Sequence, residues 1–210
     1  MVNLNIESYR ILKNEAEAVS PSKDLDSCVR WYELTYKLFA DSPMDSMNDF
    51  WRIVAYSYSW MPTIPTINSS LIEDPNELLT QLHLLKQGDS SNLSTLFKQL
   101  IPVINNSLIG TSKVLHFINP SAVPIIDSNV LRGYHIFFFK LYPEFHVPPL
   151  PAFKTPLNSK HISKYFLYFQ LLKQWVACCD GEVSMRDIEL GLFQLGKHTF
   201  KEYAKSLIYN

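Results

Sequence analysis

Apolar residues recur every three or four positions along most of this chain, which is the spacing of one face of an α-helix. The pattern predicts helices at about 24–40, 45–58, 75–87, 92–105, 111–118, 128–141, 160–179, 184–195 and 198–208. Alternation with a period of two is not sustained anywhere, so we predict no strands. The first 20 residues are polar, and we expect them to be loosely held, with one short helix at most.

Prolines and polar residues mark the ends of these helices. Asp74-Pro75 is typical of a helix start, with the aspartate as N-cap and proline in the first turn. Residues 143–158 contain five prolines, which predicts a long irregular connection. We see no internal repeat. The sequence therefore predicts an all-α fold, a single compact helical unit over residues 1–210, with lobes at 24–131 and 132–210.

The composition narrows the choice of function. Only 6 glycines are present, so a glycine-rich phosphate loop is not expected. Cys28, Cys178 and Cys179 have no metal-ligand spacing and are too few for an iron–sulfur cluster, so we predict no metal and no cofactor. No signal peptide is visible, and the apolar run at Ile136–Phe139 is too short to cross a bilayer. These features predict a cytoplasmic protein without a membrane partner.

The near-neutral charge of −1 hides an asymmetry along the chain. Residues 1–131 hold 9 Lys and Arg against 14 Asp and Glu, whereas residues 132–210 hold 10 against 6. A segregated basic region is suited to contacts with phosphates. Chance scatter of solvated surface charge explains the same numbers equally well.

The segment from Asn106 to Phe117 has the pattern of a helix end, a tight turn and a helix start. Gly110 is suited to the turn, and Thr111 or Ser112 to capping the next helix. The N–H groups at such a helix start form an anion site, so we predict that a DNA phosphate binds there.

Asp127 follows an apolar stretch and stands directly before a predicted helix. As a structural residue it is an N-cap, with its carboxylate accepting backbone N–H bonds. As a functional residue it is a carboxylate beside an apolar wall, suited to stabilising a sugar cation or orienting a water. Taken alone, the position favours the cap.

The order of Leu108 to Lys113, an apolar helix and then Val123 to Arg132 resembles the helix-hairpin-helix DNA glycosylase superfamily. Gly110 matches the second hairpin glycine, Asp127 the family's aspartate and Arg132 an arginine on the next helix. The resemblance covers about 25 residues. Two features depart from the family: Leu108 replaces the first hairpin glycine, and the helix before Asp127 is several residues shorter.

This resemblance implies a compact, two-lobed helical fold with a helix-hairpin-helix element. It also implies hydrolysis of an N-glycosidic bond that releases a damaged or modified base, for which a modified cytosine in phage DNA is one candidate. The lysine of lyase-active members falls on Ser112, which favours a monofunctional enzyme. A shift of one residue in the hairpin brings Lys113 to that position, so we keep Asp127 and Lys113 as the candidate catalytic residues.

A glycosylase flips its target base into a pocket with stacking faces and polar groups. Candidates for this base pocket are Tyr56, Tyr58, Trp60, Met61 and His116. Packing in the core explains each of these residues as well, and for the histidine it is the more common situation. Candidates for DNA phosphate contacts are Gly110, Thr111, Ser112, Arg132, Lys160 and Lys164. A solvated helix face is the ordinary explanation for the two lysines.

Two other functional classes compete with a glycosylase. One is a non-catalytic helical module that binds DNA or protein, and the near-neutral charge fits a protein-interaction module slightly better than a DNA binder. The other is an unrelated helical enzyme in which Asp127 and His116 do acid–base work. DNA is the partner that the resemblance implies, and the sequence leaves the oligomeric state open, with a monomer favoured.

Overall fold

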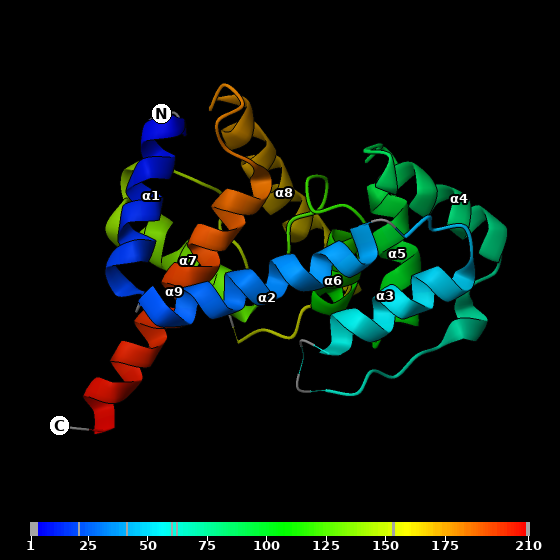
Figure 1. The fold of residues 1–210 in the computed structure, drawn as a ribbon. Helices are drawn as coiled ribbons and strands as arrows, with labels where there is room; N and C mark the ends of the chain where they lie inside the picture. Colours follow the sequence, from blue (N-terminus) through cyan, green and yellow to red (C-terminus); the bar gives the residue numbers. More distant parts are fainter. Residues whose placement is uncertain are drawn as a thin grey trace. The chain divides into compact units, whose positions relative to one another are not determined.

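The computed structural model describes residues 4–20, 22–40, 42–59, 61, 63–152 and 154–208, without the side chains of 22–30 and 200–208. Within these ranges the protein is all-helical, as predicted, and its one element of β-pairing is an isolated bridge between Ile67 and Ile104. The α-helices are α1 (Ile6–Val19), α2 (Ser22–Ala40), α3 (Met47–Ser59), α4 (Pro75–Lys86), α5 (Leu93–Val103), α6 (Leu108–Ile118), α7 (Ser128–His135), α8 (Ile162–Ala177) and α9 (Met185–Ile208) (Figure 1). Short helical turns are η1 (Ser69–Leu71), η2 (Ile136–Leu141), η3 (Pro143–Phe145) and η4 (Ser159–His161).

The chain divides into two compact units. Unit 1 comprises Met1–Val29, Ile126–Thr155 and Lys164–Asn210, and unit 2 comprises Arg30–Ile125 and Pro156–Ser163. Two of the boundaries between them fall within α2 and between Ile125 and Ile126, one residue before Asp127. Each unit has its own buried core.

The core of unit 1 is built around α9, which packs against both α7 and α1 (Figure 1). Gly133 on α7 and Gly196 on α9 let the two backbones touch, because a Cβ on either would overlap a backbone oxygen of the other helix. On α1, Leu12 packs against Gly191 of α9. Absence of a side chain at these positions is therefore what fixes the helix spacing.

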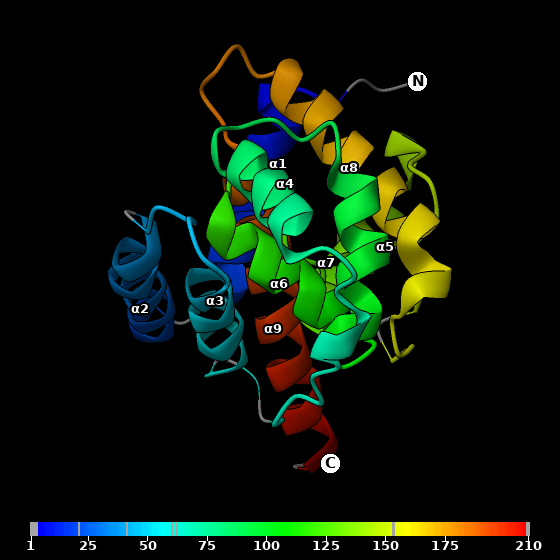
Figure 2. The ribbon, with the colours of Figure 1, turned by 90° about the vertical axis from the view of Figure 1, so that its right-hand side faces the viewer.

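The core of unit 2 is built around α6, which lies between α3 and α5 (Figure 2). Every residue of α6 is buried except Ile109 and Lys113, which are half-buried. A helix that is apolar nearly all round belongs inside a core. Ile109 and Lys113 are four residues apart, so they share the one face of α6 that solvent reaches.

Two of the helix predictions were wrong, those for the first 20 residues and for a break near Gly196, whereas the bounds predicted for the helix at 128–141 are confirmed. The first 20 residues hold a full helix, α1, capped by the Asn5 side chain and tied to α8 by the indole N–H of Trp175, which donates to the Asn5 carbonyl at 2.9 Å. The predicted break near Gly196 is absent, because its contact with α7 keeps α9 continuous. The helix predicted at 128–141 is α-helical only to His135 and then continues as the wider π-helical turn η2.

Candidate functional site

The turn between α5 and α6 is made by asparagines and not by glycine. Asn105 and Asn106 have φ angles of 56° and 45°, in the left-handed region that asparagine tolerates better than most residues. Ser107 caps α6 by accepting the N–H of Gly110 at 3.0 Å. The predictions of a turn at Gly110 and a cap at Thr111 or Ser112 were therefore wrong, since all three lie inside the helix.

Gly110 has a packing role instead. A Cβ at this position would overlap the hydroxyl of Tyr58, which comes from the end of α3. Burial raises the pKa of the Tyr58 phenol, and the nearby Asn105 side chain opposes that shift. The glycine thus admits a buried phenol against the first turn of α6.

The N–H groups at the start of α6 are mostly used within unit 2. Leu108 donates to the Leu157 carbonyl and Thr111 to the Ser107 carbonyl, each at 3.0 Å, in addition to the bond from Gly110 to the Ser107 side chain. The side chains of Thr111 and Ser112 are fully buried. A phosphate contact at Gly110, Thr111 or Ser112 would have to replace these bonds, and it stays a prediction.

The structure separates the two residues that compete for the position of the lyase lysine. Ser112 is buried, and its hydroxyl donates to the Ile109 carbonyl at 2.9 Å. Lys113 lies one residue further along α6, on the half-exposed face. Of the two, Lys113 is the side chain that a substrate can reach.

His116 is fully buried, and both of its ring nitrogens are bonded. Its Nδ1 lies 2.6 Å from the Val123 carbonyl and its Nε2 lies 2.6 Å from the hydroxyl of Tyr32. A carbonyl only accepts, so Nδ1 carries the proton, and the neutral ring accepts from Tyr32 at Nε2. This is the arrangement of a satisfied core histidine, and its role in a base pocket stays a prediction.

The other predicted pocket residues lie on or directly after α3. The ring of Tyr56 lies 4.4 Å from that of Phe39 and 5.0 Å from that of Phe117, between centroids, and Tyr58 is buried. Met61 is half-buried, and Trp60 lies outside the described residues. Tyr56, Tyr58 and His116 thus all take part in the packing of α3 and α6 in unit 2.

In unit 1, Asp127 is the N-cap of α7. Its Oδ1 accepts the N–H groups of Asn129 and Val130, both at 2.9 Å, and the residue is half-buried. Two backbone donors and the positive end of the helix stabilise the ionised carboxylate. The structure therefore shows the capping role, which also fixes the carboxylate rigidly in one place.

Arg132 lies one turn further along α7. Its guanidinium donates to the Asn129 side chain and to the Gly196 carbonyl, both at 3.0 Å. Burial lowers the pKa of Arg132, and the charge of Asp127 opposes that shift. These bonds tie α7 to α9, so Arg132 has a structural function whether or not it also contacts DNA.

Unit 1 also holds a polar cluster that no motif in the sequence indicates. It consists of the buried Tyr165 and Tyr168 on α8 and, on α9, of the buried Glu189, which forms an ion pair with the half-buried Arg186. The pKa of Tyr168 is raised well above its usual value by burial first, and then by the negative charges of Glu189 and Asp127 among others. The only sequence signal was the spacing of three residues within each pair.

The two lysines predicted to bind phosphate differ in exposure. Lys160 is exposed in η4, which belongs to unit 2, whereas Lys164 is half-buried in α8, where unit 1 resumes. Nothing in their surroundings distinguishes them from solvated lysines, and their contact with phosphate stays a prediction.

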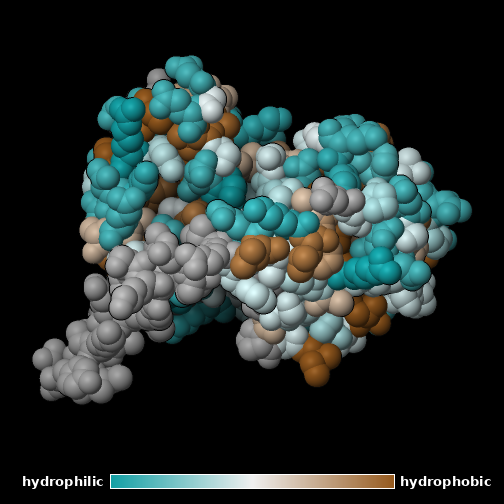
Figure 3. Space-filling view, viewed as in Figure 1, coloured by the Kyte–Doolittle hydropathy of each residue, from teal (hydrophilic) through white to brown (hydrophobic). Residues whose placement is uncertain are grey.

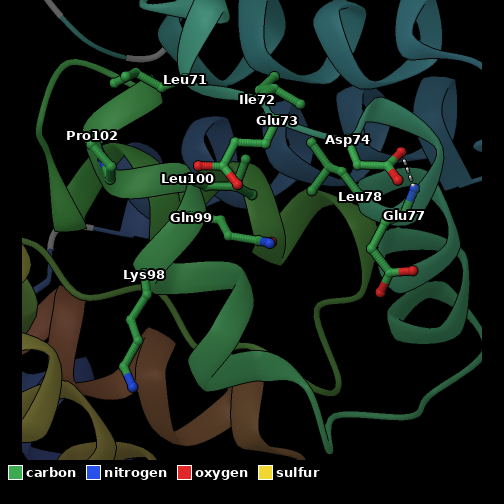
Figure 4. Close-up of a pocket in the computed structure, with 10 residues that line it drawn as sticks. All are labelled: Leu71, Ile72, Glu73, Asp74, Glu77, Leu78, Lys98, Gln99, Leu100 and Pro102. Atoms are coloured by element: carbon green, nitrogen blue, oxygen red, sulfur yellow. Dashed lines mark hydrogen bonds between the residues drawn. The ribbon is translucent and has the colours of Figure 1, made fainter.

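One pocket of about 500 Å³ lies in unit 2 between α4, α5 and η1. Figure 4 shows the Glu73 carboxylate turned toward Gln99, and Asp74 accepting the N–H of Glu77 as the cap of α4. Lys98 points away from these carboxylates. None of the residues predicted from the sequence as site residues lines this pocket.

The described residues contain no group of three or more His, Cys, Asp or Glu residues placed to hold a metal ion. None of the helices formed by these residues combines the length and apolar character of a membrane span. Comparison with protein-family models, curated proteins and solved structures found no match to this chain.

Proposed function

We propose that the protein is a DNA glycosylase that hydrolyses the N-glycosidic bond of a damaged or modified nucleotide, with Asp127 as its catalytic carboxylate. The proposal joins the sequence resemblance to one structural observation: a half-buried aspartate held at a helix N-terminus. In this proposal α5, the turn at 104–107 and α6 would correspond to the helical pair of the family, with Gly110 inside α6 and not in the turn. Asp127 follows α6 after a loop of eight residues.

The support from Asp127 is its preorganisation. A carboxylate stabilises a developing cation best when it is already fixed in place and does not need to reorient during the reaction. Asp127 meets this condition, because its Oδ1 is bonded to two backbone N–H groups.

In the proposed reaction, the bond between the anomeric carbon and the base nitrogen breaks, and its electron pair leaves with the base. The sugar ring becomes cationic, and the Asp127 carboxylate stabilises that charge. A water molecule then adds to the anomeric carbon and gives up one proton, which neutralises the departing base. The products are the free base and an abasic site.

Lys113 is the second residue to test. An amine that attacks the anomeric carbon converts a monofunctional glycosylase into a lyase, and it must be accessible in order to do so. Lys113 is on the half-exposed face of α6, whereas Ser112 is buried. We retain monofunctional hydrolysis as the proposal, with Lys113 as the residue that would change it.

The test is an excision assay on duplex and single-stranded DNA that carries oxidised, alkylated, mismatched and phage-type modified bases. Asp127→Asn keeps an N-cap of similar size and removes the negative charge. It should lower base release by about 10²–10³-fold. Asp74→Asn is the matched control, because Asp74 caps α4 through the same pair of Oδ1 bonds, at 2.9 and 3.0 Å.

The outcomes separate the competing functions. Base release that is unchanged in Asp127→Asn removes Asp127 from catalysis. Strand cleavage without alkali that borohydride traps, and that Lys113→Gln abolishes, identifies a lyase. DNA binding without release of any base in the panel favours a non-catalytic binding module, and absence of DNA binding contradicts the proposal as a whole.

A further inference from the structure

The pocket between α4, α5 and η1 combines an apolar floor with an acidic rim. Leu78 and Leu100 are buried, whereas Glu73, Glu77 and Gln99 are exposed. Its volume of about 500 Å³ lies within the range of small-molecule sites, roughly 300–1,000 Å³. Every residue that lines it belongs to unit 2, and none takes part in the proposed glycosylase reaction.

The two glutamates of the rim line the pocket without a cation beside them. The Glu73 carboxylate forms no hydrogen bond or ion pair with any residue that the structure describes, and Glu77 forms no ion pair with those residues either. Figure 4 shows the two carboxylates apart, with Glu73 turned toward Gln99 and Glu77 on the first turn of α4. Lys98 points away from both. The pocket therefore has two separate acidic ends.

A buried amide lies against Glu77. Gln81 is only 8% exposed, and its Nε2 donates to the Glu77 carboxylate at 2.8 Å. Its Oε1 is buried and has no hydrogen-bond partner among the described residues. At about 100° per residue, Gln81 falls between Glu77 and Leu78 around α4, on the face that lines the pocket. A buried acceptor without a donor is unfavourable, so this oxygen is suited to receive a donor from a ligand.

The α5 side of the pocket supplies a further acceptor. Pro102 lies inside α5 and has no N–H, so the carbonyl of Lys98, four residues earlier, lacks the helical hydrogen bond that it would otherwise accept. Both residues line the pocket. The site thus offers two carboxylates, an amide oxygen and a carbonyl oxygen. An ammonium group suits this set, because it carries three donors, no acceptor and a positive charge.

We propose that this pocket binds a small aliphatic diamine or polyamine, with one ammonium group at Glu77 and Gln81 and another at Glu73. The methylene chain between the two ammonium groups lies on Leu78 and Leu100. The outer surface of α4 is mostly hydrophilic (Figure 3), which fits a small charged ligand better than an apolar protein partner. A metal ion is a poorer fit, since the described carboxylates do not converge in a group of three or more.

The exposure of the two glutamates predicts the strength of binding. Ion pairs that solvent reaches are weak, and dissolved salt screens them. We therefore expect a ligand that binds weakly and is released as the ionic strength rises. This property is independent of glycosylase activity.

The test is an NMR chemical-shift titration of the full chain at low ionic strength, with putrescine, cadaverine and spermidine as probes. At least one probe should shift the backbone amides of the residues that line the pocket, and its Kd should rise with added salt. Glu73→Gln and Glu77→Gln should each raise that Kd about 2–5-fold, which is the usual strength of an exposed ion pair. Glu144→Gln is the matched control, because Glu144 is exposed and lies outside the pocket, and it should leave the Kd unchanged.

Gln81→Leu separates contact with the ligand from a role in folding. The variant keeps a side chain of similar size, and its loss of the bond to Glu77 is offset by removal of an unsatisfied buried oxygen. It should therefore weaken binding while the thermal unfolding temperature stays close to that of the wild type. Binding that Gln81→Leu leaves unchanged would refute the placement of an ammonium group at Glu77 and Gln81.

Butylamine, which has one amine and resembles a lysine side chain, tests the arrangement with two acidic ends. It should bind several-fold more weakly than the best of the three probes. Equal binding would assign the pocket to a lysine side chain of a protein and would overturn the proposal. Absence of shifts with every probe at millimolar concentration would overturn it too, and so would an equal loss of affinity in Glu144→Gln and in the pocket variants.

Discussion

The hydroxyl of Tyr58 occupies the space beside Gly110 in which the β-carbon of any other residue would stand. Tyr58 comes from α3 and Gly110 from the first turn of α6, so this contact sets how closely the two helices approach within unit 2. A glycine inside a helix is unfavourable by about 1 kcal/mol relative to alanine, which indicates that the contact offsets that cost.

Gly110→Ala should therefore destabilise the protein, by about 1–3 kcal/mol, because the new methyl group overlaps the phenol. Tyr58→Phe should recover part of that loss, since the nearest remaining ring atom, Cζ, would then stand 3.1 Å from the added carbon. Urea unfolding of both single variants and the double variant gives the coupling energy. Additive effects, with no coupling, would contradict the contact.

Thr111 provides a second test in the same turn. Its buried hydroxyl has no hydrogen-bond partner among the described residues. Burying an unsatisfied hydroxyl is unfavourable, so the nearly isosteric Thr111→Val should be neutral or stabilising by up to about 1 kcal/mol. The comparison variant is Ser112→Ala, which removes a buried hydroxyl that is bonded to Ile109 and should be destabilising. Equal losses in both variants would contradict this prediction.

In unit 1, alanine substitutions at the two glycines of α9 should destabilise the protein to different degrees, because only one of them faces the backbone of α7. Gly196→Ala would push a methyl group into the Asn129 carbonyl, and backbone cannot move aside without separating the helices. We expect a loss above about 3 kcal/mol. Gly191→Ala meets only the Leu12 side chain, at 3.1 Å, and should lose much less. Thermal unfolding of the two variants gives the ranking, and similar losses would contradict it.

Two substitutions at Asp127 separate the effect of its negative charge on stability from the effect of its capping hydrogen bonds. Asp127→Ala removes the acceptor for two N–H groups and should lower the free energy of unfolding by about 1 kcal/mol, whereas Asp127→Asn should change it by only a few tenths. Chemical denaturation of both variants measures this difference. If Asp127→Asn is as unstable as Asp127→Ala, the charge itself is needed for folding, and loss of activity in that variant could not be assigned to chemistry.

The hydrogen bond of Tyr142 should make the free energy of unfolding depend on pH in the alkaline range. Its hydroxyl donates to a carboxylate oxygen of Glu15 at 2.6 Å, which, with lesser effects of burial and neighbouring charge, raises the pKa of Tyr142 from 10.0 to about 12. The folded state thus holds this proton more tightly than the unfolded state does. The contribution of this hydrogen bond to the free energy of unfolding is complete below pH 10 and is lost as the pH rises toward 12. Because solvent reaches this pair, the effect should be small.

The measurement is urea unfolding at several alkaline pH values for the wild type and Tyr142→Phe. The other buried tyrosines titrate in both proteins, so the difference between the two curves isolates Tyr142. The stability advantage of the wild type should shrink through this interval. An advantage that is constant with pH would contradict the predicted role of the hydrogen bond.

Local features of the fold were readable from the sequence because they depend on neighbouring residues. Asp74-Pro75 and Asp127-Ser128 cap their helices as expected, through carboxylates that accept N–H groups two and three residues ahead. The predictions that were wrong concern features that depend on contacts with residues far away in the sequence. Gly196 interrupts a helix by propensity, and α9 continues through it only because α7 lies against it.

In the candidate site too, the features that could not be predicted are those that depend on residues far away in the sequence. The half-exposed position of Lys113 and the burial of Ser112 follow from which face of α6 meets α3, α4 and α5, and no local pattern specifies that face. Gly110 was read as a turn residue because its partner, Tyr58, is 52 positions earlier in the chain. The cluster of Tyr165, Tyr168, Arg186 and Glu189 was missed for the same reason.

The three-segment composition of unit 1 has a consequence for the order in which the chain folds during translation. Most of unit 2 is one continuous stretch, Arg30–Ile125, and it leaves the ribosome before α9, the helix that α7 packs against, exists. At about 5–20 residues per second, α1 must wait roughly 10–30 seconds for α9, against which it also packs. Unit 2 is therefore the natural early folding intermediate. Helix α1 is thus among the last of the described helices to reach its final packing.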